Sequence, residues 1–138
     1  MKLFLDTSAF AKRHLAENGS GRVRTLCEQA DSLIVSVLCL PELVSTLARL
    51  LREKKLTKGD YALIKQAAAA DLADADICQL TPAVLSSAIA LLESSPLRAM
   101  DALHVACAQA AGADLFVSAD HRQLDAARKA GIKVEDVS

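Results

Sequence analysis

The sequence predicts an α/β fold: a three-layer α/β/α sandwich whose central, mainly parallel sheet has about five strands. Short apolar runs alternate with longer segments of helical periodicity, which is the pattern of repeated strand–helix–strand units. A chain of 138 residues can bury one hydrophobic core and is too short for two domains of ordinary size, so we expect a single domain over residues 1–138. Its hydrophobic fraction of 52% and charged fraction of 24% are typical of a soluble globular protein.

The candidate strands are short apolar runs bounded by polar or turn-forming residues. They are Leu3 to Leu5, Ser32 to Ser36, Ile77 to Leu80, Asp114 to Ser118 and Ile132 to Glu135. In a parallel sheet of this size both faces are covered by helices, and ligands bind at the carboxyl ends of the strands, where helix N-termini also gather. The residues that follow each strand are therefore the first candidates for a functional site.

Helical segments separate these runs. Two are predicted between the second and third strands, over 41–54 and 57–74, and others over 81–92, 100–111 and 121–130. Pro41 suits the first turn of its helix, where leucines recur at helical spacing, and Gly112 and Gly131 end the last two helices. An earlier helix follows MKLFLDTS, where Asp6 can act as a cap by accepting hydrogen bonds from free backbone N–H groups.

Composition and charge exclude several classes of protein. No apolar run reaches the roughly 20 residues of a membrane span, and the start MKLFLDTS lacks the apolar segment of about 7 to 15 residues of a secretory signal, so we expect a cytoplasmic protein without membrane contact. A formal net charge of −1 excludes nucleic-acid binding through a globally basic surface. The cysteines, Cys27, Cys39, Cys78 and Cys107, are widely spaced, which predicts reduced, mostly buried thiols.

Four acidic residues fall at the predicted sheet edge. Asp6 follows the first strand, Glu42 ends LIVSVLCLPE just inside a helix, Asp101 opens the helix MDALHVACAQAAG, and Asp120 ends LFVSAD after the fourth strand. Each alone can be a helix cap or first-turn residue. Several carboxylates in one crevice, however, raise each other's pKa unless a cation offsets their charge. A hard divalent cation, Mg²⁺ or Mn²⁺, is the natural partner, and no cluster of histidines or cysteines points to zinc.

Four segments in this order resemble the PIN-domain family of metal-dependent ribonucleases: LDTSAFAKRH, LCLPELVSTLARLLREKKLT, LRAMDALHVACAQAAGADLFVSAD and HRQLDAARKAGIKV. The resemblance is greatest to the VapC-type toxins of bacterial and archaeal toxin–antitoxin pairs, and it covers essentially the whole chain. It implies hydrolysis of RNA phosphodiester bonds with Mg²⁺ or Mn²⁺, a homodimer, and a cognate antitoxin protein that covers the groove. A housekeeping PIN-domain RNA-processing nuclease and a non-catalytic PIN-like binding module stay open as alternatives.

The resemblance also assigns site residues. The four catalytic acids it implies are Asp6, Glu42, Asp101 and Asp120. Of these, Asp6 and Asp101 are the expected metal ligands, whereas Glu42 and Asp120 can act through water. The expected supporting residues are Thr7, Ser8, His104 and Ser118. We expect His104, three residues after Asp101 on the same side of one helix, to pack beside the site and hydrogen-bond to it rather than serve as the catalytic base.

The sequence gives weaker signals for RNA-binding residues than for the acidic site. Lys12, Arg13 and Arg122 are candidates for binding RNA phosphates, but solvated helix faces are the simpler account of these charges and of the basic stretch RLLREKKLTK. The phenylalanines lie in or beside apolar runs, so no aromatic platform for unpaired bases is predicted. We therefore expect recognition of the shape and backbone of RNA.

Two other enzyme classes that use an aspartate after the first strand are disfavoured. Phosphatases with a nucleophilic aspartate of the haloacid-dehalogenase type need a second aspartate two residues later, where this chain has Ser8. Phosphoacceptor receiver domains need an acidic pair before the site and a lysine after a late strand, and the sequence shows neither.

Overall fold

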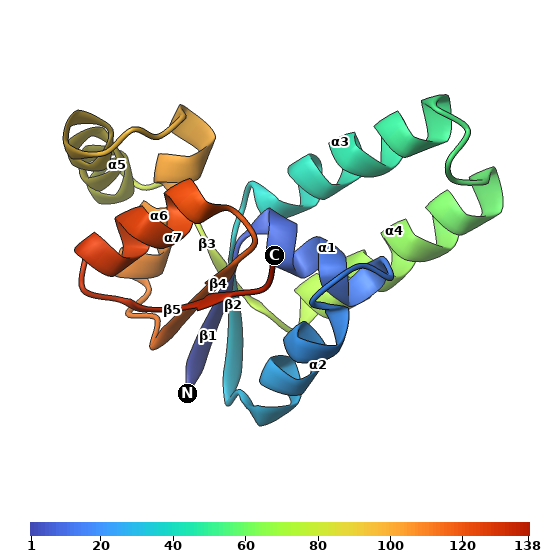
Figure 1. Cartoon of the computed structure of the whole chain (residues 1–138), viewed down its shortest axis with the longest axis horizontal. Helices are drawn as coiled ribbons and strands as arrows, with labels where there is room; N and C mark the ends of the chain where they lie inside the picture. The colour runs from blue at the N-terminus through green and yellow to red at the C-terminus, as the bar shows by residue number, and fades with distance from the viewer.

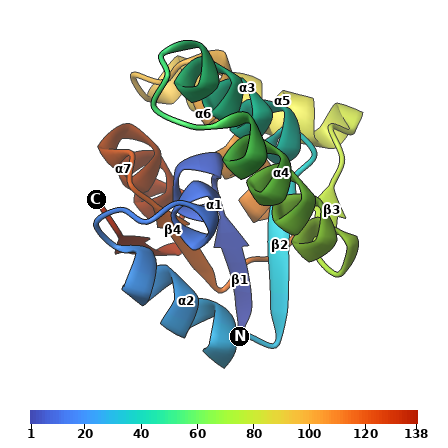
Figure 2. The ribbon, with the colours of Figure 1, turned by 90° about the vertical axis from the view of Figure 1, so that its right-hand side faces the viewer.

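A wholly parallel five-stranded sheet forms the centre of the computed structural model, which describes residues 1–138. The strands are β1 (Lys2–Leu5), β2 (Ser32–Ser36), β3 (Asp76–Cys78), β4 (Leu115–Ser118) and β5 (Lys133–Asp136). Their spatial order is β3-β2-β1-β4-β5, and β1 runs through the middle and leads into the first helix (Figure 2). The predicted parallel sheet is confirmed.

Seven helices cover the sheet on both faces. They are α1 (Thr7–His14), α2 (Ser20–Gln29), α3 (Cys39–Arg52), α4 (Lys58–Ala73), α5 (Pro82–Ser94), α6 (Ala99–Ala110) and α7 (His121–Lys129). Helices α1 to α4 lie on one side of the sheet and α5 to α7 on the other, and α3 and α4 extend away from the sheet as a pair (Figure 1). The three-layer α/β/α sandwich is therefore confirmed.

The core consists of two apolar clusters, one on each face of the sheet. Alternate residues of a strand point to opposite faces, so Leu3 and Leu5 pack with α1 to α4, whereas Phe4 packs with α5 to α7. The rings of Phe4 and Phe116 stack across β1 and β4 with centroids 5.4 Å apart. This continuous burial of the central strands fixes their register and hence the positions of the residues that follow them.

Several element boundaries differ from the predicted ones. The third strand was predicted over 77–80, but β3 comprises Asp76–Cys78, because the backbone turns at Gln79 and Leu80 packs into the core on the α5–α7 face. Helix α3 begins at Cys39, two residues before the predicted start at Pro41. Proline is tolerated there because the first four N–H groups of a helix have no partner within the helix.

The cysteines are free thiols, with Cys39 and Cys107 buried and Cys27 and Cys78 half-buried. Burial raises the pKa of the Cys39 and Cys107 thiols to about 12. The prediction of free thiols is confirmed, but only two of the four cysteines are fully buried. None of the helices combines the length and apolar character that crossing a membrane would need.

The strand order reverses its direction between β1 and β4. From β1 the chain proceeds to β2 on one side, and from β4 it proceeds to β5 on the other. Ligands of open parallel sheets bind in the crevice outside the carboxyl ends of the strands at such a reversal. The residues that follow Leu5 and Val117, which are partners in register, lie at this point.

Candidate active site

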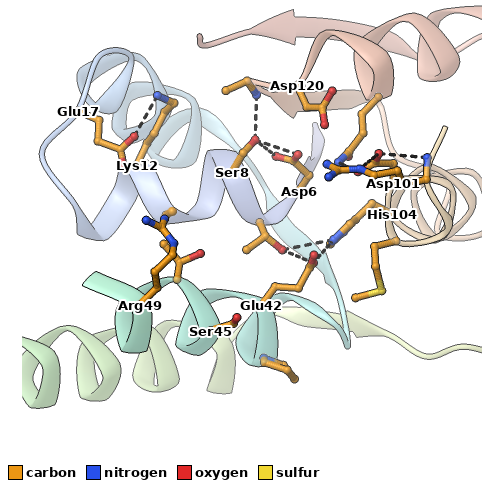
Figure 3. Close-up of a pocket in the computed structure, with 18 residues that line it drawn as sticks. Asp6, Ser8, Lys12, Glu17, Glu42, Ser45, Arg49, Asp101, His104 and Asp120 are labelled. Carbon is orange, nitrogen blue, oxygen red and sulfur yellow. Dashed lines mark hydrogen bonds and ion pairs between the residues drawn. The ribbon is translucent and has the colours of Figure 1, made fainter. Parts of the chain in front are cut away.

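A polar pocket of about 770 Å³ opens at the carboxyl ends of β1 and β4 (Figure 3). Only 3 of its 18 lining residues are hydrophobic, which suits a charged ligand. Its lining includes all four of the predicted acids, Asp6, Glu42, Asp101 and Asp120. The structure thus brings together carboxylates from α3, α6 and the ends of β1 and β4.

Asp6 is the most deeply buried of these acids and is also the N-cap of α1. Its side chain is 1% exposed, and Oδ1 accepts a hydrogen bond from the Ala9 N–H at 2.9 Å. Ser8 Oγ donates to Oδ1 at 2.7 Å, and Ser118 Oγ donates to Oδ2 at 2.7 Å. Burial raises the pKa of Asp6 above its ordinary value, although these hydrogen bonds and the charge of His104 act in the opposite direction. A cation at this carboxylate would offset the unfavourable burial of its charge.

Ser8 and Ser118 connect Asp6 to the segment that carries Asp120. The Ser8 hydroxyl accepts a hydrogen bond from the Ala119 N–H at 3.0 Å, and the Ser118 hydroxyl accepts one from the Asp120 N–H at 2.9 Å. Asp120 caps α7 in turn, because its Oδ1 accepts from the Arg122 N–H at 2.9 Å, while Oδ2 has no hydrogen bond from the protein. The two serines therefore fix the relative positions of the first and last acids.

Glu42 lies in the first turn of α3 and is held through one oxygen. Oε1 accepts a hydrogen bond from Thr7 Oγ1 at 2.7 Å and contacts Nε2 of His104, which is buried in α6. Burial raises the pKa of Glu42, but the hydrogen bonds from His104 and Thr7 and the charges of His104 and Arg98 outweigh it, so the pKa lies below the ordinary value. Oε2 has no hydrogen bond from the protein. His104 packs beside the site and bonds to it, as expected.

Asp101, 4% exposed, is held by two side chains. The guanidinium of Arg98 lies 3.3 Å from Oδ2, and Gln123 of α7 donates to Oδ1 through Nε2 at 3.0 Å. The Arg98 backbone N–H also donates to Oδ2 at 3.4 Å, which is how an acid in the first turn of a helix caps its end. The carboxylate of Asp101 is therefore oriented from both α6 and α7.

The carboxylates fit a hydrated divalent cation better than a closed cage of protein ligands. No three of the acidic, histidine or cysteine side chains are grouped closely enough to hold an ion by themselves. Mg²⁺ usually takes one or two carboxylates and completes its octahedral shell with waters and substrate phosphate oxygens. Glu42 Oε2 and Asp120 Oδ2 are free to accept hydrogen bonds from such waters. The buried Oε1 of Gln123, another lining atom, also lacks a partner and is a further acceptor for an ordered water.

The cations predicted to contact RNA lie in different surroundings. Lys12 lines the pocket but is buried, and its ammonium donates to the Asn18 carbonyl at 2.6 Å. Arg13 pairs with Asp71 at 2.8 Å, away from the pocket, and Arg122 is exposed at the start of α7 outside the lining. Their contacts to RNA stay predictions.

Several lining residues were not predicted from the sequence. They include Arg98 and Gln123, which hold Asp101, and Ser45, Thr46 and Arg49 on α3. The signal for the last three was present, because they recur at helical spacing after Glu42 on the polar side of a leucine-rich helix. No comparable pattern distinguishes Gln123 from any other polar helix residue.

Comparison with known proteins gives a consistent picture. Residues 3–129 match the family model described as PIN domain. Ribonuclease VapC45 of Mycobacterium tuberculosis strain CDC 1551 is 32% identical over 134 residues, which cover 96% of this chain and 93% of that protein. Ribonuclease VapC46 of strain H37Rv is also 32% identical over 134 residues, covering 96% of this chain and 95% of its own length.

Solved structures share the fold at lower sequence identity. VapC20 of Mycobacterium tuberculosis, a toxin that cleaves the sarcin–ricin loop, aligns over 90% of this chain and 94% of its own with a TM-score of 0.68 and 18% identity. FitAcB from Neisseria gonorrhoeae aligns over 97% of this chain and 96% of its own with a TM-score of 0.71 and 14% identity.

Proposed function

This chain belongs to the PIN-domain family, and on that basis we propose that it is a metal-dependent endoribonuclease and the toxin of a toxin–antitoxin pair. The observation that carries the proposal is the convergence of Asp6, Glu42, Asp101 and Asp120 on one polar pocket. The curated relatives that match nearly the whole chain are named ribonucleases, which supports RNA as the substrate.

Asp6 and Asp101 are the proposed direct ligands of Mg²⁺ or Mn²⁺, with Glu42 and Asp120 acting through water. When bound, the cation would polarise the scissile phosphate, assist deprotonation of the attacking water and neutralise charge on the leaving oxygen. Ser8 and Ser118 hold the Asp6 carboxylate in place, and Gln123 holds that of Asp101. Fixed partners of this kind keep ligand oxygens oriented before the ion arrives.

Thr7 and His104 have the proposed task of keeping Glu42 ionised and turned toward the pocket. Both contact Oε1, so Oε2 is left to accept a hydrogen bond from the hydrolytic water or from water around the cation. His104 is 1% exposed and its Nε2 is engaged by Glu42, which suits a positioning residue better than a base that must reach the substrate.

We also propose a cognate antitoxin and a homodimer as partners, in a cytoplasmic setting. A toxin–antitoxin complex from Klebsiella pneumoniae contains a chain of the same fold, with a TM-score of 0.68 at 13% identity. The leucine-rich helix α3 directs Leu43 and Leu47 into the core, so its apolar side is not available to a partner. Exposed apolar side chains are concentrated instead on α5, where Leu85, Ile89 and Leu92 are 43%, 56% and 38% exposed. Their spacing puts them on one side of the helix, and this stripe is the proposed dimer contact.

The test of the activity is cleavage of a mixed cellular RNA pool by the purified protein with Mg²⁺ or Mn²⁺. We expect cleavage to be lost with a chelator and in Asp101→Asn, and to be retained in Asp125→Asn, which removes an exposed acid of α7 outside the pocket. Circular dichroism of the variants checks that the fold is intact. Cleavage that persists in the chelator or in Asp101→Asn would contradict the proposed site.

A further inference from the structure

The pocket continues well beyond the acids along the polar side of α3. Glu42, Ser45, Thr46 and Arg49 line it at positions i, i+3, i+4 and i+7, while Leu43 and Leu47 of the same helix are buried in the core. Seven residues of helix correspond to about 10 Å along the axis. Figure 3 shows Glu42, Ser45 and Arg49 following one another along α3 beneath α1. A single hydrated ion at the acids leaves this outer part of the pocket without a ligand.

Three cations other than histidine line the pocket, and two of them pair with acids of the same lining. The Lys12 side chain is 7% exposed and lies against Asn18 and Glu17, with its ammonium 3.5 Å from the Glu17 carboxylate. Arg98 holds Asp101 from the rim of the pocket. Both charges thus offset acidic or carbonyl oxygens of the chain itself.

Arg49 differs from the other two because its partner, Glu53, does not line the pocket. Its only ion pair is with Glu53, one turn further along α3, at 3.4 Å, and the two side chains are 53% and 40% exposed. Such an exposed surface pair contributes little to stability, so another anion can replace Glu53 at little cost. The hydroxyls of Ser45 and Thr46, one turn closer to the acids, have no hydrogen bond to another residue of the protein. A guanidinium with two free hydroxyls beside it suits a phosphate, which arginine can bind through two parallel hydrogen bonds.

The charge distribution along the pocket matches a polynucleotide. At the acidic end a phosphate can approach only together with a cation, whereas at the outer end Arg49 supplies the positive charge from the protein. An RNA strand with its scissile phosphate at the acids carries its next phosphates along the same groove. We propose that Arg49, with Ser45 and Thr46, is a second subsite of this pocket that binds a backbone phosphate adjacent to the scissile one. The inference rests on the proposed function and adds to it the residues that hold the substrate.

The test compares steady-state RNA cleavage by the wild-type protein, Arg49→Ala, Arg49→Lys and Arg52→Ala. Arg52 is a matched control because it is exposed on the same helix, carries the same charge and does not line the pocket. For Arg49→Ala we expect the KM to rise about tenfold with kcat within about twofold, because the lost contact is equally strong in the ground state and transition state. The slope of log(kcat/KM) against log[salt] should become shallower by about 0.7, the effect of one phosphate contact on a single strand. Arg49→Lys should recover part of the KM, and Arg52→Ala should match the wild type.

A binding measurement separates failure of this subsite from failure of the nuclease. The probe is a fluorescein-labelled single-stranded RNA, and its anisotropy is followed with Asp101→Asn protein, with and without the added Arg49→Ala or Arg52→Ala change. Weaker binding by about tenfold for Arg49→Ala alone supports the subsite even if no RNA in the pool is cleaved. Equal KM and equal RNA affinity for the two arginine variants would overturn it, whether or not the wild-type protein cleaves RNA. An Arg49→Ala variant that binds RNA normally but no longer binds an antitoxin would likewise overturn it in favour of a protein contact.

Discussion

Nε2 of His104 and Oε1 of Glu42 are in direct hydrogen-bond contact, and this contact joins α6 to α3 across the pocket. Asp101 lies one turn before His104 on α6, so the same helix supplies one acid and positions another. Thr7 of α1 reaches the same Glu42 oxygen, which ties three helices together at a single atom. The consequences of this arrangement can be measured through the ionisation of Glu42.

Replacing His104 should change the pH dependence of cleavage. The imidazole is one of the groups that lower the pKa of Glu42 against the effect of burial, so in His104→Leu that pKa rises. We expect the acid limb of the kcat/KM profile to move to higher pH, with a smaller shift in His104→Gln, because the amide can still donate a hydrogen bond. His121→Gln, a change at an exposed histidine, is the control. An unchanged acid limb in His104→Leu would mean that Glu42 does not need to be ionised for cleavage.

Asp6→Asn should stabilise the metal-free protein at neutral pH. Burial raises the pKa of Asp6 above its ordinary 3.8, so the folded state binds its proton more tightly and stability falls as the pH rises from that value through the folded pKa. Asparagine removes the buried charge and remains a good N-cap. In chelator we expect an increase of about 1 kcal/mol, or roughly 3 to 5 °C in Tm.

Added Mg²⁺ should change the Tm of the wild-type protein but not that of Asp6→Asn. It should raise the Tm of the wild-type protein, because ligands that bind only the folded state stabilise it, and should leave that of Asp6→Asn nearly unchanged. Asp125→Asn, at an exposed carboxylate, should respond to Mg²⁺ as the wild type does. An equal Mg²⁺ shift in wild type and Asp6→Asn would remove Asp6 from the set of metal ligands.

Two glycines at the start of α2 should respond in opposite directions to alanine. Gly19 has a φ of +85°, and a Cβ there would lie 2.2 Å from the Val137 carbonyl oxygen. Gly19→Ala should therefore destabilise the protein by more than about 2 kcal/mol in urea unfolding. Gly21 lies inside the helix, and no atom beyond the helix's own backbone is within 4 Å of the place that a Cβ would take, so Gly21→Ala should stabilise by about 0.4 to 1 kcal/mol. Similar effects of both changes would contradict the close approach of the C-terminal segment to α2.

The apolar stripe on α5 predicts the oligomeric state. Ile89 is 56% exposed at its centre, and a charge there should be tolerated by the monomer but not by a packed interface. In sedimentation velocity we expect the wild-type protein to be a dimer and Ile89→Asp to shift to the monomer with an unchanged circular dichroism spectrum. Leu63→Asp, at a 67% exposed leucine of α4, is the control. A dimer that survives Ile89→Asp would place the interface elsewhere.

Much of the fold followed from the sequence because its signals are local. In the run Ser32 to Ser36, a serine stands at each end of an apolar stretch, and the run forms β2 with the predicted limits. Asp6 directly follows β1 and Asp120 comes two residues after the end of β4, so a parallel sheet brings both acids to one edge. The predicted strand limits were less accurate at the edge of the sheet. Two of the three β3 residues are exposed there, so burial does not determine where this strand begins and ends.

The parts of the site that the sequence did not predict depend on contacts between distant elements. Gln123 is buried because α7 packs beside α6, and nothing near it in the sequence distinguishes it from a surface glutamine. In the sequence, Lys12 cannot be distinguished from a lysine on an exposed helix face. In the fold, the segment after α1 brings Asn18 and Glu17 to its ammonium. Arg98 and Arg49 acquire their roles only from the pocket they border. Three-dimensional packing, rather than residue type, selects among these polar side chains.

The bond from Ser118 to Asp6 spans 112 residues of sequence, so it can form only late in the synthesis of the protein. Asp6 is among the first residues to be made. Its partner Ser118 and the strand β4 are made much later, when only α7 and β5 remain. At about 5 to 20 residues per second, translation needs on the order of 10 s to cover that interval. During this time β1 has at most one of its two neighbours, β2, and the pocket has no wall on the β4 side. The proposed activity is thus withheld from every chain that has not yet been made past β4, and a ribosome that stalls before β4 releases a product without a complete acidic site.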